Sequence, residues 1–98
     1  MSKYRRAAKV DDNQARIVQE LRAVIGVTMQ IDHDDILVGY KGKTHQVELK
    51  NPARCLGKDG TLKVGALRPS QIELLETWTG SYFVAWDSRM ILIKIGAV

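Results

Sequence analysis

The chain has 98 residues, of which 45% are hydrophobic and 27% are charged, and its formal net charge is +4; this length leaves room for one hydrophobic core and not for two. No apolar run reaches the roughly 20 residues of a membrane span, and no apolar segment follows the basic N-terminus as it would in a secretory signal. One cysteine, Cys55, excludes an intramolecular disulfide and a multi-cysteine zinc site. We expect a single soluble domain, with a cytoplasmic location by default.

A helix is the first element that the pattern predicts. Residues 1–10 are basic and are expected to form a flexible arm. Asp11 or Asp12 can cap a helix, and the spacing from Asp11 to Gln14 is that of a capping box. The residues that follow predict a helix over about 12–25, which ends at a glycine. Its apolar positions recur at one-face helical spacing and are Ile17, Val18, Leu21, Val24 and Ile25.

Three short strands are predicted next. Val27–Ile31 alternates in polarity, and Ile36–Val38 is a compact apolar run. Residues 40–43 form a hairpin loop, after which Thr44–Lys50 alternates cleanly between two faces. One face of this strand is expected to pack in the core and holds His45, Val47 and Leu49. The other face is polar, is available for chemistry, and holds Thr44, Gln46, Glu48 and Lys50.

The second half of the chain predicts a long loop, a helix and a strand. Asn51–Leu67 is long for a loop in a small domain, which usually indicates a functional flap. Pro69 suits the first turn of a helix that Gly80 would end. Tyr82–Trp86 predicts a strand, and Ser88–Ile95 fits either a short helix or an edge strand. The order α-β-β-β-α-β predicts an α/β fold with a mixed sheet flanked by helices.

Some side chains in this half are predicted to be buried. Gln71 shares the inward face of the predicted helix with Leu75 and Trp78, and a buried amide needs a hydrogen-bond partner. A place in the functional site would supply one. The aromatic residues are expected to anchor the core rather than to stack on nucleic-acid bases, and they are Phe83, Trp78 and Trp86.

Basic residues gather in two stretches. Residues 1–10 carry four basic residues and no acid, and residues 50–68 carry five basic residues and one acid. Each phosphate contact releases condensed counterions, so such stretches favour a polyanionic partner, although a solubilising surface also explains them. The side chains of the second stretch that we expect to contact DNA are Arg54, Lys58, Lys63 and Arg68.

The candidate catalytic motif is Glu48-Leu49-Lys50. Two residues apart on a strand, the carboxylate and the ammonium project from the same face about 6.6 Å apart. The hairpin brings the strand that starts at Asp35 alongside. Two carboxylates on neighbouring strands with a lysine nearby suit metal-assisted phosphodiester hydrolysis, because Mg²⁺ needs only one or two carboxylates and lowers the pKa of a bound water. A simple cross-strand ion pair is the alternative for an isolated triplet of this kind.

The triplet belongs to a longer pattern of four segments. These are Asp35-Ile-Leu-Val-Gly39, Gly42-Lys-Thr-His-Gln-Val-Glu-Leu-Lys50, Leu67-Arg-Pro-Ser-Gln71 and Trp78-Thr-Gly80. Together they resemble the VRR-NUC branch of the PD-(D/E)XK nuclease superfamily, which includes small phage-borne proteins similar to Holliday-junction resolvases. The resemblance runs from about Asp11 to Asp87. It implies a restriction-endonuclease-like core, in one nuclease domain over residues 11–98.

The resemblance also implies a set of site residues. The catalytic set would be Asp35, Glu48, Lys50 and Gln71. The metal, Mg²⁺ or Mn²⁺, would be bound by Asp35, Glu48 and the main-chain carbonyl of Leu49.

Three positions either have a second explanation or depart from the pattern of that branch. Gln14 matches a polar position near the active site, and it is equally explained as half of the capping box. Asp34 stands where proline is common, so two adjacent acids compete for the role assigned to Asp35. Arg68 stands where threonine is usual, which removes a helix N-cap.

The leading hypothesis is a metal-dependent endonuclease that acts on DNA, with branched DNA such as a Holliday junction as the expected substrate. The alternatives are a catalytically silent nucleic-acid-binding module of the same fold, and an interaction domain of a larger complex. One small domain has one metal site and cuts one strand, so paired cuts favour a homodimer with two-fold symmetry. The apolar segment Met90–Val98 or the strand Tyr82–Trp86 could provide the contact.

Overall fold

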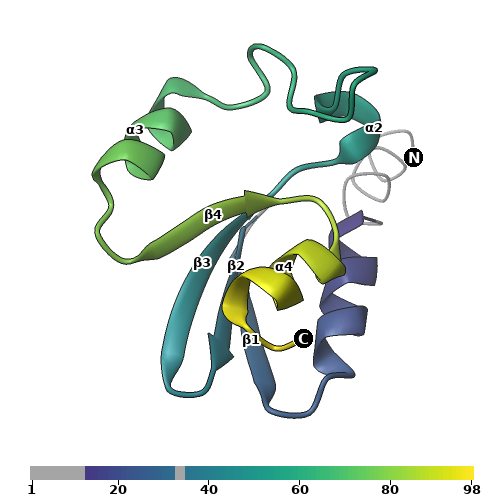
Figure 1. Cartoon of the computed structure of the whole chain (residues 1–98), viewed down its shortest axis with the longest axis vertical. Helices are drawn as coiled ribbons and strands as arrows, with labels where there is room; N and C mark the ends of the chain where they lie inside the picture. The colour runs from purple at the N-terminus through teal and green to yellow at the C-terminus, as the bar shows by residue number, and fades with distance from the viewer. Residues whose placement is uncertain (1–12, 33–34) are drawn as a thin grey trace, which may run out of the picture.

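The computed structural model describes residues 13–32 and 35–98, which form a four-stranded mixed sheet with helices around it (Figure 1). The elements in chain order are a helix over residues 13–22, β1 (Val27–Asp32), β2 (Asp35–Tyr40), β3 (Lys43–Leu49), α2 (Pro52–Cys55), α3 (Pro69–Thr77), β4 (Ser81–Ala85) and α4 (Ser88–Ile95). The strands lie in the order β1-β2-β3-β4, with the first two pairs antiparallel and the β3–β4 pair parallel. The predicted α/β fold with a mixed sheet and flanking helices is confirmed.

Some predicted features, namely the basic arm, the capping positions 11 and 12, and Asp34, lie outside the described residues. Within the described ranges, no helix has the length and apolar character needed to cross a membrane.

Alternation along the strands gives the sheet an apolar face and a polar face. The apolar face packs against the first helix and α4 in one cluster of buried side chains, which contribute about 1.5–3 kcal/mol each when fully buried. Its members are Ile17, Val18, Leu21, Val27, Ile36, Val38, Val47, Leu49, Phe83, Ala85 and Ile91. The predicted packing face of β3 is therefore confirmed, and His45 on the same face is buried as well.

The β2–β3 hairpin sets the register of the sheet. Its two-residue turn consists of Lys41 (φ 50°) and Gly42 (φ 79°), and positive φ at both positions is what a type I′ turn requires. The turn matches the twist of the flanking strands, so pairing continues without interruption from the turn to Asp35 opposite Glu48. A short turn at one end of the hairpin thus determines which side chains are neighbours at the other.

The first helix is shorter than predicted. It ends at residue 22, and hydrogen bonds from Val24 N to Leu21 O (3.0 Å) and from Val27 N to Val24 O (3.2 Å) then form a turn. This turn leads to Gly26, which has a left-handed φ of 89°. Because the chain has left helical geometry, Ile25 points away from the core and is 97% exposed, so its predicted place on the buried face is wrong.

The structure defines the conformation of two segments of the second half more closely than the sequence did. The predicted long loop over Asn51–Leu67 contains α2 and an isolated bridge between Leu56 and Leu62, and it arches from α2 to α3 (Figure 1). The C-terminal segment, which fitted a helix or a strand, is α4. The Asp87 side chain caps it by accepting a hydrogen bond from Met90 N (2.8 Å).

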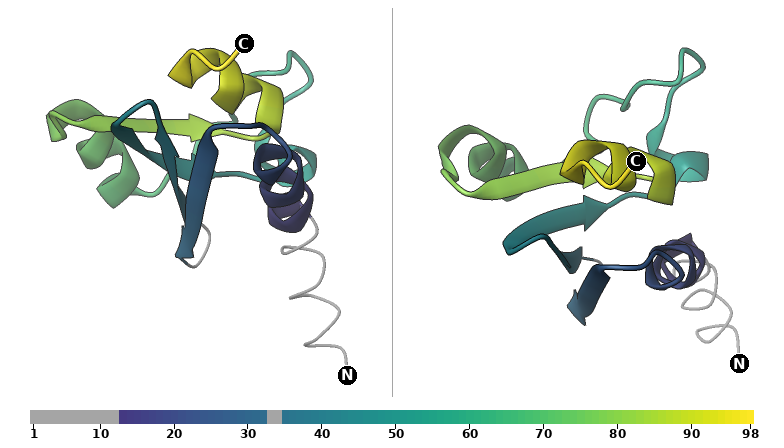
Figure 2. Two further views of the ribbon diagram at one scale, coloured as in Figure 1. Left: turned by 90° about the horizontal axis from the view of Figure 1, so that it is seen from below. Right: turned by 60° about the horizontal axis from the view of Figure 1, so that its bottom comes forward.

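The predicted burial along α3 is correct only at its first turn. Gln71 is 4% exposed, whereas Leu75 is 41% and Trp78 is 53% exposed, so their predicted place in the core is wrong. Gln71 reaches the sheet through Lys50, but the later turns of α3 lie away from the first helix and α4 (Figure 2). The indole of Trp78 folds back over Gly80, where a Cβ atom would come within 2.8 Å of its nitrogen. Phe83 is in the core, as predicted.

We predict that His45 makes the free energy of unfolding fall in acid. Its Nδ1 lies 2.6 Å from the Ser81 hydroxyl oxygen, and desolvation, followed by the charge of Lys43, lowers the pKa of its imidazole from 6.5. The unfolded chain therefore takes up this proton at a higher pH than the folded chain does. The stabilising contribution is complete above pH 6.5 and is lost as the pH falls through the folded-state pKa.

Urea unfolding of the wild type and of His45→Gln, at pH 7.5 and pH 5.5, measures this contribution. The other titratable groups are common to both proteins, so the wild type should lose more stability on acidification than the variant. Equal losses would contradict the prediction.

Candidate functional site

Two carboxylates meet on the polar face of the sheet, where β2 begins and β3 ends. Asp35 is the first residue of β2 and pairs directly with Glu48 in the antiparallel register. Directly opposite residues have Cβ atoms about 4.5–5.5 Å apart. Oδ1 of Asp35 and Oε2 of Glu48 are both out of contact with solvent, and Glu48 as a whole is 3% exposed. The two predicted acids are therefore neighbours, and Glu48 is more buried than a solvated polar face would make it.

This pairing is unfavourable for the fold by itself. Like charges directly opposite each other on a sheet destabilise it, and burial adds the cost of removing water from the carboxylates. Lys50 partly offsets that cost, because its Nζ lies 3.9 Å from Oε2 of Glu48 with the lysine side chain 12% exposed. The site thus combines two acids and one lysine, the composition that the sequence predicted.

Gln71 holds the lysine in place. Its Oε1 accepts one hydrogen bond from Lys50 Nζ (3.0 Å) and another from the main-chain N–H of Arg68 (2.9 Å). The Arg68 side chain gives no capping hydrogen bond, as predicted, and Gln71 satisfies the N–H at the start of α3 instead. One buried amide oxygen therefore joins the beginning of α3 to the ammonium group of Lys50, directly after β3.

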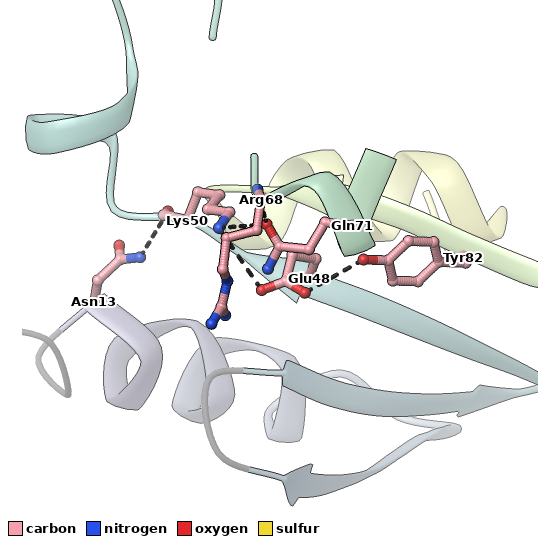
Figure 3. Close-up of polar contacts among 6 residues, drawn as sticks. All are labelled: Asn13, Glu48, Lys50, Arg68, Gln71 and Tyr82. Atoms are coloured by element: carbon pink, nitrogen blue, oxygen red, sulfur yellow. Dashed lines mark hydrogen bonds and ion pairs between the residues drawn. The ribbon is translucent and has the colours of Figure 1, made fainter. Parts of the chain in front are cut away.

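Two further residues complete the network, and neither was predicted for this site. The Tyr82 hydroxyl donates a hydrogen bond to Oε1 of Glu48 (3.3 Å), and Asn13 Nδ2 donates one to the main-chain oxygen of Lys50 (3.1 Å) (Figure 3). Gln14, the polar residue that the resemblance indicated, is half-buried beside Asn13. The place of Gln14 near the active site stays a prediction.

The predicted DNA-binding residues fall into two groups. Arg68 directly precedes α3, and its side chain extends on the side of Glu48 and Lys50 (Figure 3). Arg54 on α2 is exposed, as are Lys58 and Lys63 in the segment that leads to α3. Hydrogen bonds within this segment, such as Lys63 N to Cys55 O (2.8 Å), fold it back on itself. Only Arg68 belongs to the surroundings of the acid pair, and the DNA contacts of all four remain a prediction.

The donor set suits a hard divalent cation. Mg²⁺ and Mn²⁺ prefer oxygen ligands, and Mg²⁺ keeps several waters, so two carboxylates are sufficient. Asp35 and Glu48 offer these oxygens from two paired strands, and Leu49 is the last residue of β3, beside both Glu48 and Lys50. Across residues 13–32 and 35–98, no three side chains of His, Cys, Asp or Glu gather at one place. The pair of carboxylates on paired strands therefore fits a magnesium-type site.

Comparison with known proteins adds no family to this geometry. No protein-family model matches the chain, and the comparisons with curated proteins and with solved structures found no match. The arrangement of the residues around Asp35 and Glu48 is therefore the feature that indicates a function.

Proposed function

We propose that the protein is a metal-dependent endonuclease that hydrolyses DNA phosphodiester bonds with Mg²⁺ or Mn²⁺. The observation that carries this proposal is the direct pairing of Asp35 with Glu48, with a buried oxygen on each and Lys50 Nζ 3.9 Å from Glu48. A bound cation would turn this destabilising pair of charges into a binding site. The same three residues are the ones that the resemblance to the VRR-NUC branch assigns to catalysis.

The order of the elements supports a restriction-endonuclease-like core for this chain. A helix precedes three antiparallel strands, and α3 then connects β3 to β4, which is parallel to it. This is the predicted order α-β-β-β-α-β, with α2 and α4 added to it. The acid pair lies on the face opposite the hydrophobic core, so the chemistry would not disturb the packing.

Each residue of the site has a defined task in this proposal. Asp35 and Glu48 would hold the cation together with the carbonyl of Leu49, and the bound cation would lower the pKa of a water and offset charge on the phosphate. An ammonium group has three N–H donors. Gln71 takes one donor of Lys50 and Glu48 attracts another, which leaves one to bind a phosphate oxygen or orient the attacking water.

Substitution of the acids tests the catalytic assignment. We predict that Asp35→Asn, Glu48→Gln and Lys50→Met each lower the rate of Mg²⁺-dependent cleavage by a factor of roughly a hundred or more. The two amide variants should keep or raise the melting temperature in EDTA, because each removes one of two adjacent negative charges. Cleavage of plasmid DNA and of a four-way junction, with Mg²⁺ and with EDTA, is the measurement.

Asp34→Asn is the matched control and should retain most of the activity. An inactive Asp34→Asn beside an active Asp35→Asn would show that the acids are assigned wrongly. Binding of DNA without cleavage by the wild type would favour the silent nucleic-acid-binding module. Absence of both binding and cleavage would favour an interaction domain.

The basic segment before α3 should bind phosphates rather than take part in the chemistry. For Lys58→Ala combined with Lys63→Ala, we predict weaker DNA binding and a flatter salt dependence, by about one unit of slope per lost contact. Single-turnover cleavage at saturating enzyme should change little. Binding is measured as a function of salt concentration, with Lys41→Ala in the β2–β3 turn as the control. An unchanged slope would mean that both lysines only face solvent.

A homodimer is proposed because two coordinated cuts require two sites. Apolar side chains are available for the contact near the C-terminus, where Ile93 is 56% and Val98 is 76% exposed. We predict that sedimentation without DNA gives about twice the chain mass of 11.0 kDa, and that Ile93→Glu shifts the protein toward the monomer. A monomer that still makes paired cuts in one binding event would contradict a stable dimer.

A further inference from the structure

We propose that Tyr82 is a positioning residue of the metal site, whose hydroxyl determines which oxygen of Glu48 faces the cation. The inference rests on the proposed function, and it assigns a role in the site to a residue that the sequence pattern predicted only as part of a strand. It makes Tyr82 part of the apparatus that sets metal affinity, without direct contact between Tyr82 and the metal.

The two oxygens of Glu48 have different neighbours. Oε1 accepts the hydrogen bond from the Tyr82 hydroxyl (3.3 Å), while Oε2 is buried and lies 3.9 Å from Lys50 Nζ (Figure 3). The terminal torsion of a glutamate is broad and roughly two-fold, so the side chain itself does not distinguish its oxygens. The tyrosine on one side and the lysine on the other therefore make the distinction.

Tyr82 is placed by the backbone of the sheet and not by a loop. β4 pairs with β3 in parallel register, in which Tyr82 is opposite Gln46 and Val84 is opposite Glu48. Tyr82 therefore lies two residues before the position opposite Glu48, on the same face of the sheet, and its phenol spans this offset to contact the Glu48 carboxylate. The next residue, Phe83, is buried in the core and fixes the strand beneath. Groups held on strands in this way keep their geometry better than groups held on loops.

The Tyr82 hydroxyl is a neutral hydrogen-bond donor, so it can orient the Glu48 carboxylate without competing with a bound metal ion as a second cation would. A neutral donor stabilises the ionised form of the carboxylate, yet it does not compete with a metal for the other oxygen. A length of 3.3 Å is long for an O–H···O hydrogen bond, and such contacts often tighten only when the site is loaded. Hydrogen-bonded partners of metal ligands change affinity or activity by about 10- to 100-fold when they are removed.

The α3–β4 unit thus supports both Glu48 on β3 and Lys50 directly after it. Gln71 at the start of α3 holds Lys50, and Tyr82 on β4 holds Glu48. Both supporting groups are neutral, so neither changes the net charge that a cation and a phosphate would meet. Loss of Gln71 should disturb the lysine, whereas loss of the Tyr82 hydroxyl should disturb the metal ligand.

The variant Tyr82→Phe tests this inference, because it removes one oxygen atom and keeps the ring. The measurement is Mn²⁺ binding to the DNA-free protein, by calorimetry or by electron paramagnetic resonance. We expect the Kd for Mn²⁺ to rise about tenfold, with an unchanged melting temperature in EDTA. Tyr40→Phe, beside the β2–β3 turn, is the matched control and should bind Mn²⁺ as the wild type does. Cleavage by Tyr82→Phe should be slow at limiting Mg²⁺ and should approach the wild-type rate at saturating Mg²⁺.

The possible failures are distinguishable. If the wild type binds Mn²⁺, Glu48→Gln does not, and Tyr82→Phe binds as tightly as the wild type, the role of Tyr82 is refuted while the metal site stands. A lower melting temperature with unchanged Mn²⁺ affinity would make Tyr82 merely structural and would also refute the proposal. If the wild type binds no Mn²⁺, the proposed function and this inference both fail.

Discussion

The antiparallel register between β2 and β3 is the constraint on which the core and the candidate site both depend. A shift of one residue would turn every side chain of a strand to the opposite face of the sheet. It would place Glu48 in the hydrophobic cluster and Val47 in solvent. The buried aliphatic side chains contribute about 1.5–3 kcal/mol each, and those of β2 and β3 depend on this register, whereas the two acids directly opposite each other oppose it. Hydrophobic burial therefore wins, and it holds Asp35 and Glu48 together against their mutual repulsion.

The crossover connection from β3 through α3 to the parallel strand β4 orients the side chains of Glu48 and Lys50. Antiparallel pairing alone would bring the acids together but would leave Lys50 and Glu48 free to adopt several rotamers. The passage through α3 to β4 returns two neutral polar groups to the same face, one for each of these side chains. A separation of tasks follows, in which the hairpin supplies the charged groups and the crossover supplies the groups that orient them.

The sequence predicts those features that depend on neighbours along the chain. The alternation of β3 and the Lys41-Gly42 turn together account for the acid pair, because a short hairpin has few possible registers. Tyr82 was missed because its contact with Glu48 requires one particular parallel register of β4, and no periodicity encodes that choice. Trp78 shows the same limit, because it was predicted to be buried and is exposed. Its helical spacing from Gln71 is correct, but the presence of a partner beneath that turn is a tertiary property.

The amide oxygen of Gln71 stabilises two structures at once, since it accepts hydrogen bonds from the main-chain N–H of Arg68, the N-cap residue of α3, and from the Lys50 ammonium. Fraying of the first turn of α3 would carry this acceptor away, so it would release the lysine in the same step. Local opening of a helix end costs far less free energy than global unfolding. The population of the ordered site is consequently tied to the local stability of one helical turn. Hydrogen exchange at that turn would report directly on how often the lysine is in place.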